Sequence, residues 1–222
     1  MTHEEILQGL YDNTLIGNAP EVKDLTNQGL ADGMDPESLL YDALIPSLEE
    51  VGARFERGDF FVPEMLIAAR AMQGALDILR PLLAETGAKP IGTFVMGTVK
   101  GDVHDIGKNL VNIMLEGAGF TVHDLGVNVA PERFVEEVQK HEPDIVGFSA
   151  FLTTTMPMFK ANINALQKAG LRDRVIVMVG GAPVTQEYAN AVGADGYAAD
   201  ASTAVRMAKA LIEQQRNQAA TV

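Results

Sequence analysis

The chain reads Gly101-Asp102-Val103-His104-Asp105-Ile106-Gly107-Lys108-Asn109 between an apolar run at residues 91–96 and a helical pattern that begins at Leu110. Open α/β sheets place their ligand sites in loops of this kind, where a strand gives way to a glycine-flanked polar loop and then to a helix. The stretch therefore predicts the first β-α unit of a parallel sheet, with a ligand site in its loop.

The loop places a histidine two residues after an aspartate. Side chains at positions i and i+2 of an extended chain share a face, so Asp102 could accept a hydrogen bond from one imidazole nitrogen of His104. The other nitrogen would be free to bind a metal, because a carboxylate behind a histidine commonly fixes the tautomer of a metal ligand. A solvated histidine beside a turn-capping or helix-capping aspartate fits the same pattern. The Asp-x-His spacing alone leaves both interpretations open.

The spacing of the loop excludes a phosphate-binding loop. Gly107-Lys108 opens a helix, but five residues separate Gly101 from Gly107 where the phosphate-binding motif has four. Asn109 also stands where that motif has the Ser or Thr that binds magnesium.

Composition and charge narrow the class of protein. Of the 222 residues 47% are apolar and 21% are charged, which is typical of a globular protein. The 17 basic and 30 acidic residues give a net charge of −13, which argues against nucleic acid or an anionic membrane as the principal partner. The absence of cysteine excludes disulfides, thiolate metal sites and cysteine nucleophiles. We see no secretory signal and no apolar stretch of 18 residues, so we expect a cytoplasmic protein.

The first part of the chain, residues 1–87, shows helical periodicity only and is predicted to form a four-helix bundle with short connections. Asp35-Pro36 predicts a helix start, and Pro63 is expected to open the fourth helix. Pro46 interrupts the third helix and is expected to kink it. Residues 88–90 are expected to form a linker between this helical cap domain and the rest of the chain.

From residue 91 to residue 217, short β-type runs alternate with helical patterns. Five β-α units of this kind imply a flavodoxin-like or Rossmann-like five-stranded parallel sheet with helices on both faces. In that topology the first and third strands flank the point at which ligands bind. Residues 218–222 are expected to be a frayed tail. The predicted strands are 91–96, 120–125, 144–149, 175–179 and 196–197, and the predicted helices are 108–117, 131–141, 155–169, 184–192 and 201–215.

Unusual stretches also follow the third and fourth predicted strands. The hydroxyl-rich segment from Ser149 to Thr155 can supply donors and acceptors without filling space, and Gly180-Gly181 allows a close approach of backbone. Each stretch alone also fits a plain turn or a helix cap. If the predicted strand order is right, both meet the His104 loop at one edge of the sheet and form a polar slot beside a histidine that can bind a metal.

Three separated motifs resemble the corrinoid-binding signature of cobalamin-dependent methionine synthase, coenzyme-B12 mutases and the corrinoid proteins of methyltransferase systems. The 41 residues between the first motif and the second match the family's spacing. The motifs are Asp102-x-His104-x-x-Gly107, Ser149 and Gly180-Gly181.

The resemblance extends beyond these motifs. Residues 98–109 are very similar to the corresponding stretch of methionine synthase, and residues 55–63 resemble the segment that covers the upper corrin face in methyl-carrying members. Phe151 departs from the family, which usually has leucine at this position; we expect a change of packing against the slot and no loss of binding.

The resemblance implies a role for individual residues. His104 would replace the cofactor's own dimethylbenzimidazole as the lower ligand of cobalt, and Asp102 and Thr155 would complete a hydrogen-bonded triad. Phe55 and Val62 would shield the methyl group, although their spacing also fits ordinary bundle core. The residues expected to contact the cofactor are Gly101, Asp102, Val103, His104, Asp105, Ile106, Gly107, Ser149, Phe151, Thr153, Gly180, Gly181, Phe55 and Val62.

The resemblance also implies a function, that of a corrinoid methyl carrier. Cobalamin or a related corrinoid, bound base-off with the histidine on, would alternate between Co(I) and methylcobalamin, and Co(II) would be its inactive state. A substrate-specific methyltransferase would supply the methyl group, a second methyltransferase acting on tetrahydrofolate or coenzyme M would receive it, and a reductive activase is a further partner of such systems. The chain would then be the non-autonomous corrinoid subunit of a methyltransferase system. The alternatives are a B12-dependent regulator or light sensor, the small subunit of a mutase, and a cobalamin storage protein.

Overall fold

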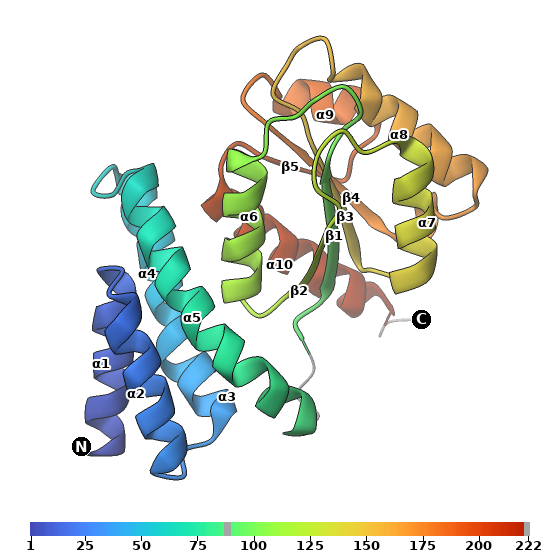
Figure 1. Cartoon of the computed structure of the whole chain (residues 1–222). Coiled ribbons are helices and arrows are strands. Elements are labelled where there is room, and N and C mark those ends of the chain that lie inside the picture. The colour runs from blue at the N-terminus through green and yellow to red at the C-terminus, as the bar shows by residue number, and fades with distance from the viewer. Residues whose placement is uncertain (87–89, 220–222) are drawn as a thin grey trace. The chain divides into compact units, whose positions relative to one another are not determined.

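The computed structural model describes residues 1–86 and 90–219, which divide into an N-terminal helical unit and a C-terminal α/β unit (Figure 1). The division falls between residues 89 and 90. Residues 88 and 89 of the predicted linker lie outside the described residues. None of the described helices is long and apolar enough to cross a membrane.

Side chains cap the start of two helices of the helical unit, α1 and α3. Thr2 accepts a hydrogen bond from the Glu5 amide while the Glu5 carboxylate accepts one from the Thr2 amide, which satisfies two free donors at the start of α1. Asp35 caps α3 in a similar way through the Glu37 amide at 2.9 Å, so the predicted helix start at Asp35-Pro36 is confirmed. The elements of this unit are α1 His3–Leu15, α2 Ala19–Ala31, α3 Pro36–Ser38, a π-helical turn Leu39–Leu44, α4 Ile45–Arg57 and α5 Val62–Thr86.

Pro46 disturbs the third predicted helix in a specific way. The backbone before it, Leu39–Leu44, is π-helical, and the Ile45 amide donates to the carbonyl of Leu40, five residues earlier. A proline has no N–H to donate, and in a regular α-helix its ring clashes with the carbonyl four residues earlier. The expected kink therefore takes the form of a wider turn that ends where α4 begins.

The turn between α4 and α5 is set by a glycine. Gly58 has φ +79 and ends α4 in the left-handed conformation, and its amide donates to Arg54 and Phe55 carbonyls. The Phe61 amide then donates to the Glu64 carboxylate at 2.9 Å, which caps the start of α5. The turn thus joins the C-terminal end of α4 to the N-terminal end of α5.

The α/β unit contains a five-stranded parallel sheet in the order β2-β1-β3-β4-β5 (Figure 1). This confirms the predicted flavodoxin-like topology, in which β1 and β3 lie side by side at the centre. The strands are β1 Thr93–Thr98, β2 Thr121–Asp124, β3 Ile145–Ser149, β4 Ile176–Gly180 and β5 Gly196–Ala198, and the helices are α6 Ile106–Gly117, α7 Pro131–His141, α8 Pro157–Lys168, α9 Gln186–Val192 and α10 Ala201–Ala219.

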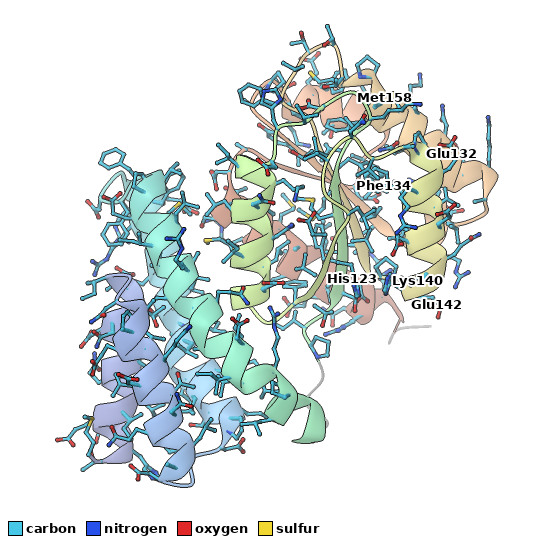
Figure 2. The ribbon with its side chains drawn as sticks, in the orientation of Figure 1. His123, Glu132, Phe134, Lys140, Glu142 and Met158 are labelled. Carbon is cyan, nitrogen blue, oxygen red and sulfur yellow. The ribbon has the colours of Figure 1, made fainter. Side chains whose placement is uncertain are left out.

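Helices cover both faces of this sheet, with α7 and α8 on one side and α6 and α10 on the other (Figure 1). Val95, Val146 and Val177 pair with one another across β1, β3 and β4. All three are fully buried in one continuous core with residues of α7 and α8. Phe134 points from α7 into this core (Figure 2), where its ring meets Phe148 edge-on at 4.8 Å. Burial of both faces explains why the strands are continuous apolar runs.

The end of the chain differs from the prediction at two positions. Helix α10 continues to Ala219, so residues 218 and 219 are helical rather than frayed. The rest of the predicted tail, 220–222, lies outside the described residues.

Candidate functional site

The carboxyl ends of β1, β3 and β4 lie in one row. Thr98 of β1 pairs with Ser149 of β3, and Ser149 pairs with Gly180 of β4. The loops that follow these strands therefore start side by side, as expected for parallel strands in register. The structure brings together the three motifs that the sequence separates by up to 79 positions, from Asp102 to Gly181.

Asp102 is the centre of the arrangement. Its side chain is fully buried, and it accepts five hydrogen bonds from groups in two loops. Oδ1 accepts from the ring Nδ1 of His104 at 2.7 Å and from the His104 amide at 3.1 Å. Oδ2 accepts from the Thr155 hydroxyl at 2.7 Å and from the amides of Phe151 at 2.8 Å and Leu152 at 3.2 Å. The predicted contact between Asp102 and His104 is present.

The hydrogen bonds determine the charge of this carboxylate. Burial by itself would raise the pKa of Asp102, but the hydrogen bonds from Thr155, His104 and the Phe151 amide outweigh burial and hold the pKa well below its usual range. Asp102 is therefore an ionised acceptor at neutral pH.

This acceptor fixes the tautomer of His104. A carboxylate can only accept, so the ring Nδ1 carries the proton and Nε2 presents a lone pair. Within the described chain Nε2 has no hydrogen-bond partner, and 45% of the His104 side chain is exposed. The imidazole is thus held on one nitrogen and open on the other, which is the arrangement of a metal ligand with a carboxylate behind it.

Thr155 holds the opposite side of the carboxylate. Its Oγ1 lies 2.7 Å from Asp102 Oδ2 and 2.8 Å from the Leu152 carbonyl, and a hydroxyl has one proton to donate. The Leu152 carbonyl already accepts the amides of Thr155 and Met156 at 3.0 and 3.2 Å. The hydroxyl proton therefore goes to the charged carboxylate, where a hydrogen bond is stronger.

Asn128 is a supporting residue that the sequence reasoning missed. It lies in the loop between β2 and α7 at φ +56, its Oδ1 accepts from the Gly101 amide at 2.7 Å, and its own amide donates to the Asp102 carbonyl at 2.8 Å. Thr98 adds a third contact, from its hydroxyl to the His104 carbonyl at 2.9 Å. An asparagine two residues after Gly126 in a strand-to-helix loop is a turn signal, but the three corrinoid-binding motifs follow the first, third and fourth strands and not the second.

Lys108 is buried although it lies in the first turn of α6. Its side chain is 1% exposed, and Nζ lies 2.7 and 2.6 Å from the two carboxylate oxygens of Asp124 and 2.6 Å from Asn109 Oδ1. Asn109 in turn donates to the Asp105 carbonyl and carboxylate at 2.7 and 3.2 Å. The lysine therefore fastens the end of the His104 loop to β2 and is not free to bind a phosphate.

The glycines of the site have different surroundings. A Cβ at Gly181, which has φ +132, would meet the backbone carbonyl of Ala150, and one at Gly180 would lie 3.1 Å from the Ala198 carbonyl. Close approach of neighbouring backbone is thus a sufficient reason for this pair. A Cβ at Gly107 would meet no atom within 4 Å. Gly107 therefore leaves space beside the loop that no described residue of the α/β unit fills.

Ser149 and Thr153, the predicted hydroxyl lining, lie on the segment that follows β3. Ser149 is half-buried at the strand end, and Thr153 is exposed two residues before Thr155. The structure shows no partner for either hydroxyl among the residues it describes, so both are available to a ligand.

Large apolar side chains are exposed on the segments that carry His104 and the partners of Asp102. Val103 is 68% exposed, Ile106 70%, Phe151 51% and Leu152 40%; Val103, Phe151 and Leu152 belong to the two loops that hold His104, and Ile106 is the first residue of α6. Exposed apolar groups gathered in this way commonly mark a binding surface. Phe151 does more than change the packing of the slot, because its ring stacks on the imidazole of His104 with centroids 4.3 Å apart.

Phe55 and Val62 lie in the helical unit at the two ends of the turn between α4 and α5. Phe55 is half-buried in the last turn of α4, and Val62 is 39% exposed at the first position of α5. Their predicted role in shielding a methyl group remains a prediction.

The donor set fits a metal that arrives inside a macrocycle. Across residues 1–86 and 90–219, no group of three or more His, Cys, Asp or Glu side chains could hold a metal ion. His104 offers a single nitrogen, which suffices for a cobalt ion whose equatorial ligands belong to a corrin. A corrin also fits the exposed apolar side chains of this site and the open space at Gly107.

Comparison with known proteins agrees with this chemistry. A family model described as a B12 binding domain matches residues 92–206, and a second model with that description matches residues 6–80. The dimethylamine corrinoid protein of Methanosarcina barkeri is 42% identical over 214 residues, which cover 96% of this chain and all of that protein.

Two solved structures are similar over nearly the whole chain. The methanol:cobalamin methyltransferase complex of Methanosarcina barkeri matches with a TM-score of 0.82 at 31% identity, covering 94% of this chain and 80% of that one. A cobalamin-binding protein from Desulfitobacterium hafniense DCB-2 matches with a TM-score of 0.76 at 30% identity, covering 92% and 98% of the two chains.

Proposed function

Since the chain belongs to the family of corrinoid proteins with B12 binding domains, we propose that it carries a methyl group from a substrate-specific methyltransferase to a second methyltransferase. The bound corrinoid supplies a cobalt centre that accepts and releases the methyl group. The protein's own residues hold that centre, orient it and control its lower ligand. This division of work fits a site that offers one imidazole nitrogen, Nε2 of His104, while Asp102 holds the other nitrogen of the ring.

The observation that carries the proposal is the fixed, half-exposed imidazole of His104. We propose that Nε2 binds cobalt from below while the cofactor's own base is displaced. The ionised Asp102 holds Nδ1 at 2.7 Å and so keeps the lone pair on the outward nitrogen. The displaced nucleotide arm would enter the slot beside Gly107, Ser149 and Thr153, where the structure has open space and unpaired hydroxyls.

Asp102 would hold the proton of the His104 ring when the corrinoid is bound. An imidazole that binds a metal through Nε2 must be neutral, and its remaining proton would stay on Nδ1 against the carboxylate. The buried Thr155 hydroxyl donates to the other oxygen of Asp102 and would hold the carboxylate in place. We propose that this hydrogen-bonded pair controls the lower ligand of the cofactor.

The donor that fits best is a methylated amine. The similar protein from Methanosarcina barkeri, which this chain covers from end to end, is called a dimethylamine corrinoid protein. We propose dimethylamine as the first donor to test, with tetrahydrofolate or coenzyme M as the acceptor type and a reductive activase as a third partner. Phe55 and Val62 would shield the methyl group between transfers.

The negative charge of the helical unit indicates what kind of partner surface it would bind. Residues 1–89 contain sixteen Asp and Glu residues and six Lys and Arg residues, whereas the remainder of the chain is nearly balanced. We propose that the acidic helical unit is attracted to basic surfaces on both methyltransferases. Such attraction raises the rate of encounter and weakens with added salt.

A methylation assay tests the proposal. The protein is loaded with cobalamin, reduced to the Co(I) state and mixed with a dimethylamine methyltransferase and dimethylamine, and methylation of the bound corrinoid is followed by its visible spectrum. We expect methylation that needs both the amine and the methyltransferase, followed by loss of the methyl group when an acceptor methyltransferase is added. Parallel samples contain monomethylamine, trimethylamine or methanol.

Three outcomes would contradict the proposal in different ways. Methylation by another donor alone would change the substrate and leave the carrier function in place. A loaded protein that no methyltransferase methylates, but that hands its corrinoid to an apo-protein, would be a store. A loaded protein that changes its oligomeric state in light without methylation would be a sensor.

A further inference from the structure

The side chain of Phe151 lies flat against the imidazole of His104. The ring centroids are 4.3 Å apart and the ring planes differ by 26°, which is a stacked arrangement. Both rings are about half-exposed, so the stack stands at the surface of the loop and not in the core. The same residue departs from the leucine that the family usually has at this position.

The hydrogen bond to Asp102 leaves one motion of the imidazole unrestricted. A single N–H···O contact at 2.7 Å fixes where Nδ1 lies, but the ring can still turn about that contact. Such a turn would swing Nε2 away from the direction in which it must meet a metal. A flat partner against one face of the ring opposes this motion, because aromatic pairs prefer stacked or edge-on geometries.

Phe151 also reaches the carboxylate through its backbone. Its amide donates to Asp102 Oδ2 at 2.8 Å, on the opposite oxygen from the one that binds His104. One residue therefore contacts both members of the pair, with its backbone on Asp102 and its ring on His104. A substitution of the side chain removes the ring and leaves the amide in place.

We infer that Phe151 is a positioning residue for the metal ligand, whose ring holds the plane of the His104 imidazole so that Nε2 points to the corrin. The inference rests on the proposed function, since it presumes that Nε2 binds cobalt. A leucine could cover the imidazole but offers no flat face. The stack favours the oriented ring by about 3- to 10-fold, the range found for aromatic pairs.

The apo-protein provides a first test that needs no cofactor. Proton NMR of wild-type protein should show the carbon-bound ring protons of His104 shifted upfield by the ring current of Phe151, and Phe151→Leu should abolish this shift. Leu152→Ala is the matched control, because Leu152 is the next residue, is also exposed and also donates its amide to Asp102. Equal His104 resonances in wild type and Phe151→Leu would overturn the inference.

The loaded protein provides the second test. Protein containing 15N-labelled histidine is loaded with cobalamin in the Co(II) state and titrated with unlabelled imidazole, while EPR separates ligation by His104 from ligation by free imidazole. We expect half-displacement at about 3- to 10-fold lower imidazole in Phe151→Leu. We expect wild-type values in Phe151→Tyr, and also in Tyr41→Leu, which removes an exposed aromatic ring from the helical unit.

The outcomes separate this inference from the proposed function. If Phe151→Leu behaves as wild type while His104→Ala loses the labelled nitrogen, the ring of Phe151 does not position the ligand and the inference fails alone. If His104→Ala keeps the spectrum of wild type, the ligand assignment itself is wrong.

Discussion

Thr155 and Asp102 are 53 residues apart in the sequence, and the threonine Oγ1 lies 2.7 Å from the aspartate Oδ2 in a buried hydrogen bond. The contact joins the loop after β3 to the loop after β1. These loops meet because β1 and β3 are neighbours in the sheet. His104 donates to the other oxygen of the same carboxylate, so its position also depends on this order of strands. The local Asp-x-His spacing places the pair, and this distant hydroxyl completes it.

Loss of the Thr155 hydroxyl should loosen the carboxylate. Thr155→Val keeps the shape of the side chain but removes a donor from a buried charged acceptor, so we expect a loss of about 1 to 3 kcal/mol in the free energy of unfolding. Thr155→Ser keeps the donor and should stay close to wild type. Urea unfolding followed by circular dichroism measures both, and a larger loss in Thr155→Ser than in Thr155→Val would show that the methyl group matters instead of the hydroxyl.

The charge of Asp102 should make stability depend on acid pH. Because its pKa is lowered in the folded protein, the stabilisation is complete above the unfolded-state value of about 4 and is lost as pH falls through the lower folded-state pKa. Asp102→Asn should therefore be less stable than wild type at pH 7, and the difference should begin to shrink below about pH 4. Urea midpoints of both proteins between pH 7 and pH 2.5 measure this. A difference that grows on acidification would contradict the assignment.

The glycines Gly107 and Gly181 should respond differently to alanine. Gly181→Ala forces a side chain into φ +132 and against the Ala150 carbonyl, so a loss of roughly 2 to 4 kcal/mol in stability is expected. Gly107→Ala meets no protein atom and lies in a helix, so stability should be unchanged or slightly higher. If Gly107 lines the slot, the same variant should bind cobalamin about 10-fold more weakly, because the methyl group occupies ligand space. Unchanged affinity, measured by calorimetry, would remove Gly107 from the site.

Two stacked histidines outside the His104 site should make the free energy of unfolding depend on pH near neutrality. His123 of β2 stacks on His141 at the end of α7, with ring centroids 3.7 Å apart. Lys140 lies near His123 (Figure 2). Burial and the adjacent His141 lower the pKa of His123. Below about pH 6.5 the unfolded chain binds a proton at this histidine more readily than the folded protein does. The free energy of unfolding is therefore at its full value above about pH 6.5 and declines below it.

Substitution of His123 tests this dependence. The stability of the wild type should fall between pH 7.5 and pH 5.5, and His123→Gln should lose less over the same range. A steeper fall in the variant would show that the stacked pair favours the proton. Reconstituted cobalamin affinity serves as the control, since neither histidine belongs to the His104 site.

The sequence was sufficient for the order of elements and for the central triad. Apolar runs alternating with helical patterns predicted the strands, and the count of five β-α units predicted the flavodoxin-like order that the sheet has. Asp102, His104 and Thr155 could be named in advance because short spacings and the resemblance to corrinoid proteins both pointed to them.

The contacts that the sequence could not predict are long-range. Asn128 clamps Gly101 across 27 positions, and Lys108 reaches Asp124 across 16, so no local pattern connects either pair. A lysine in the first turn of a helix ordinarily faces solvent, and only the tertiary structure shows that this one is buried. Pro46 likewise predicts a kink, but not that the kink takes the form of a π-helical turn over Leu39–Leu44.

EPR of the loaded protein addresses the role of His104 itself. Cobalamin with natural 14N is bound to protein that carries 15N-labelled histidine, and the metal is brought to the Co(II) state. Ligation by Nε2 of His104 predicts that each cobalt line is split into a doublet by 15N, and that His104→Ala abolishes the doublet. Triplet splitting from 14N in the labelled wild type would show that the cofactor keeps its own base, and it would contradict histidine ligation.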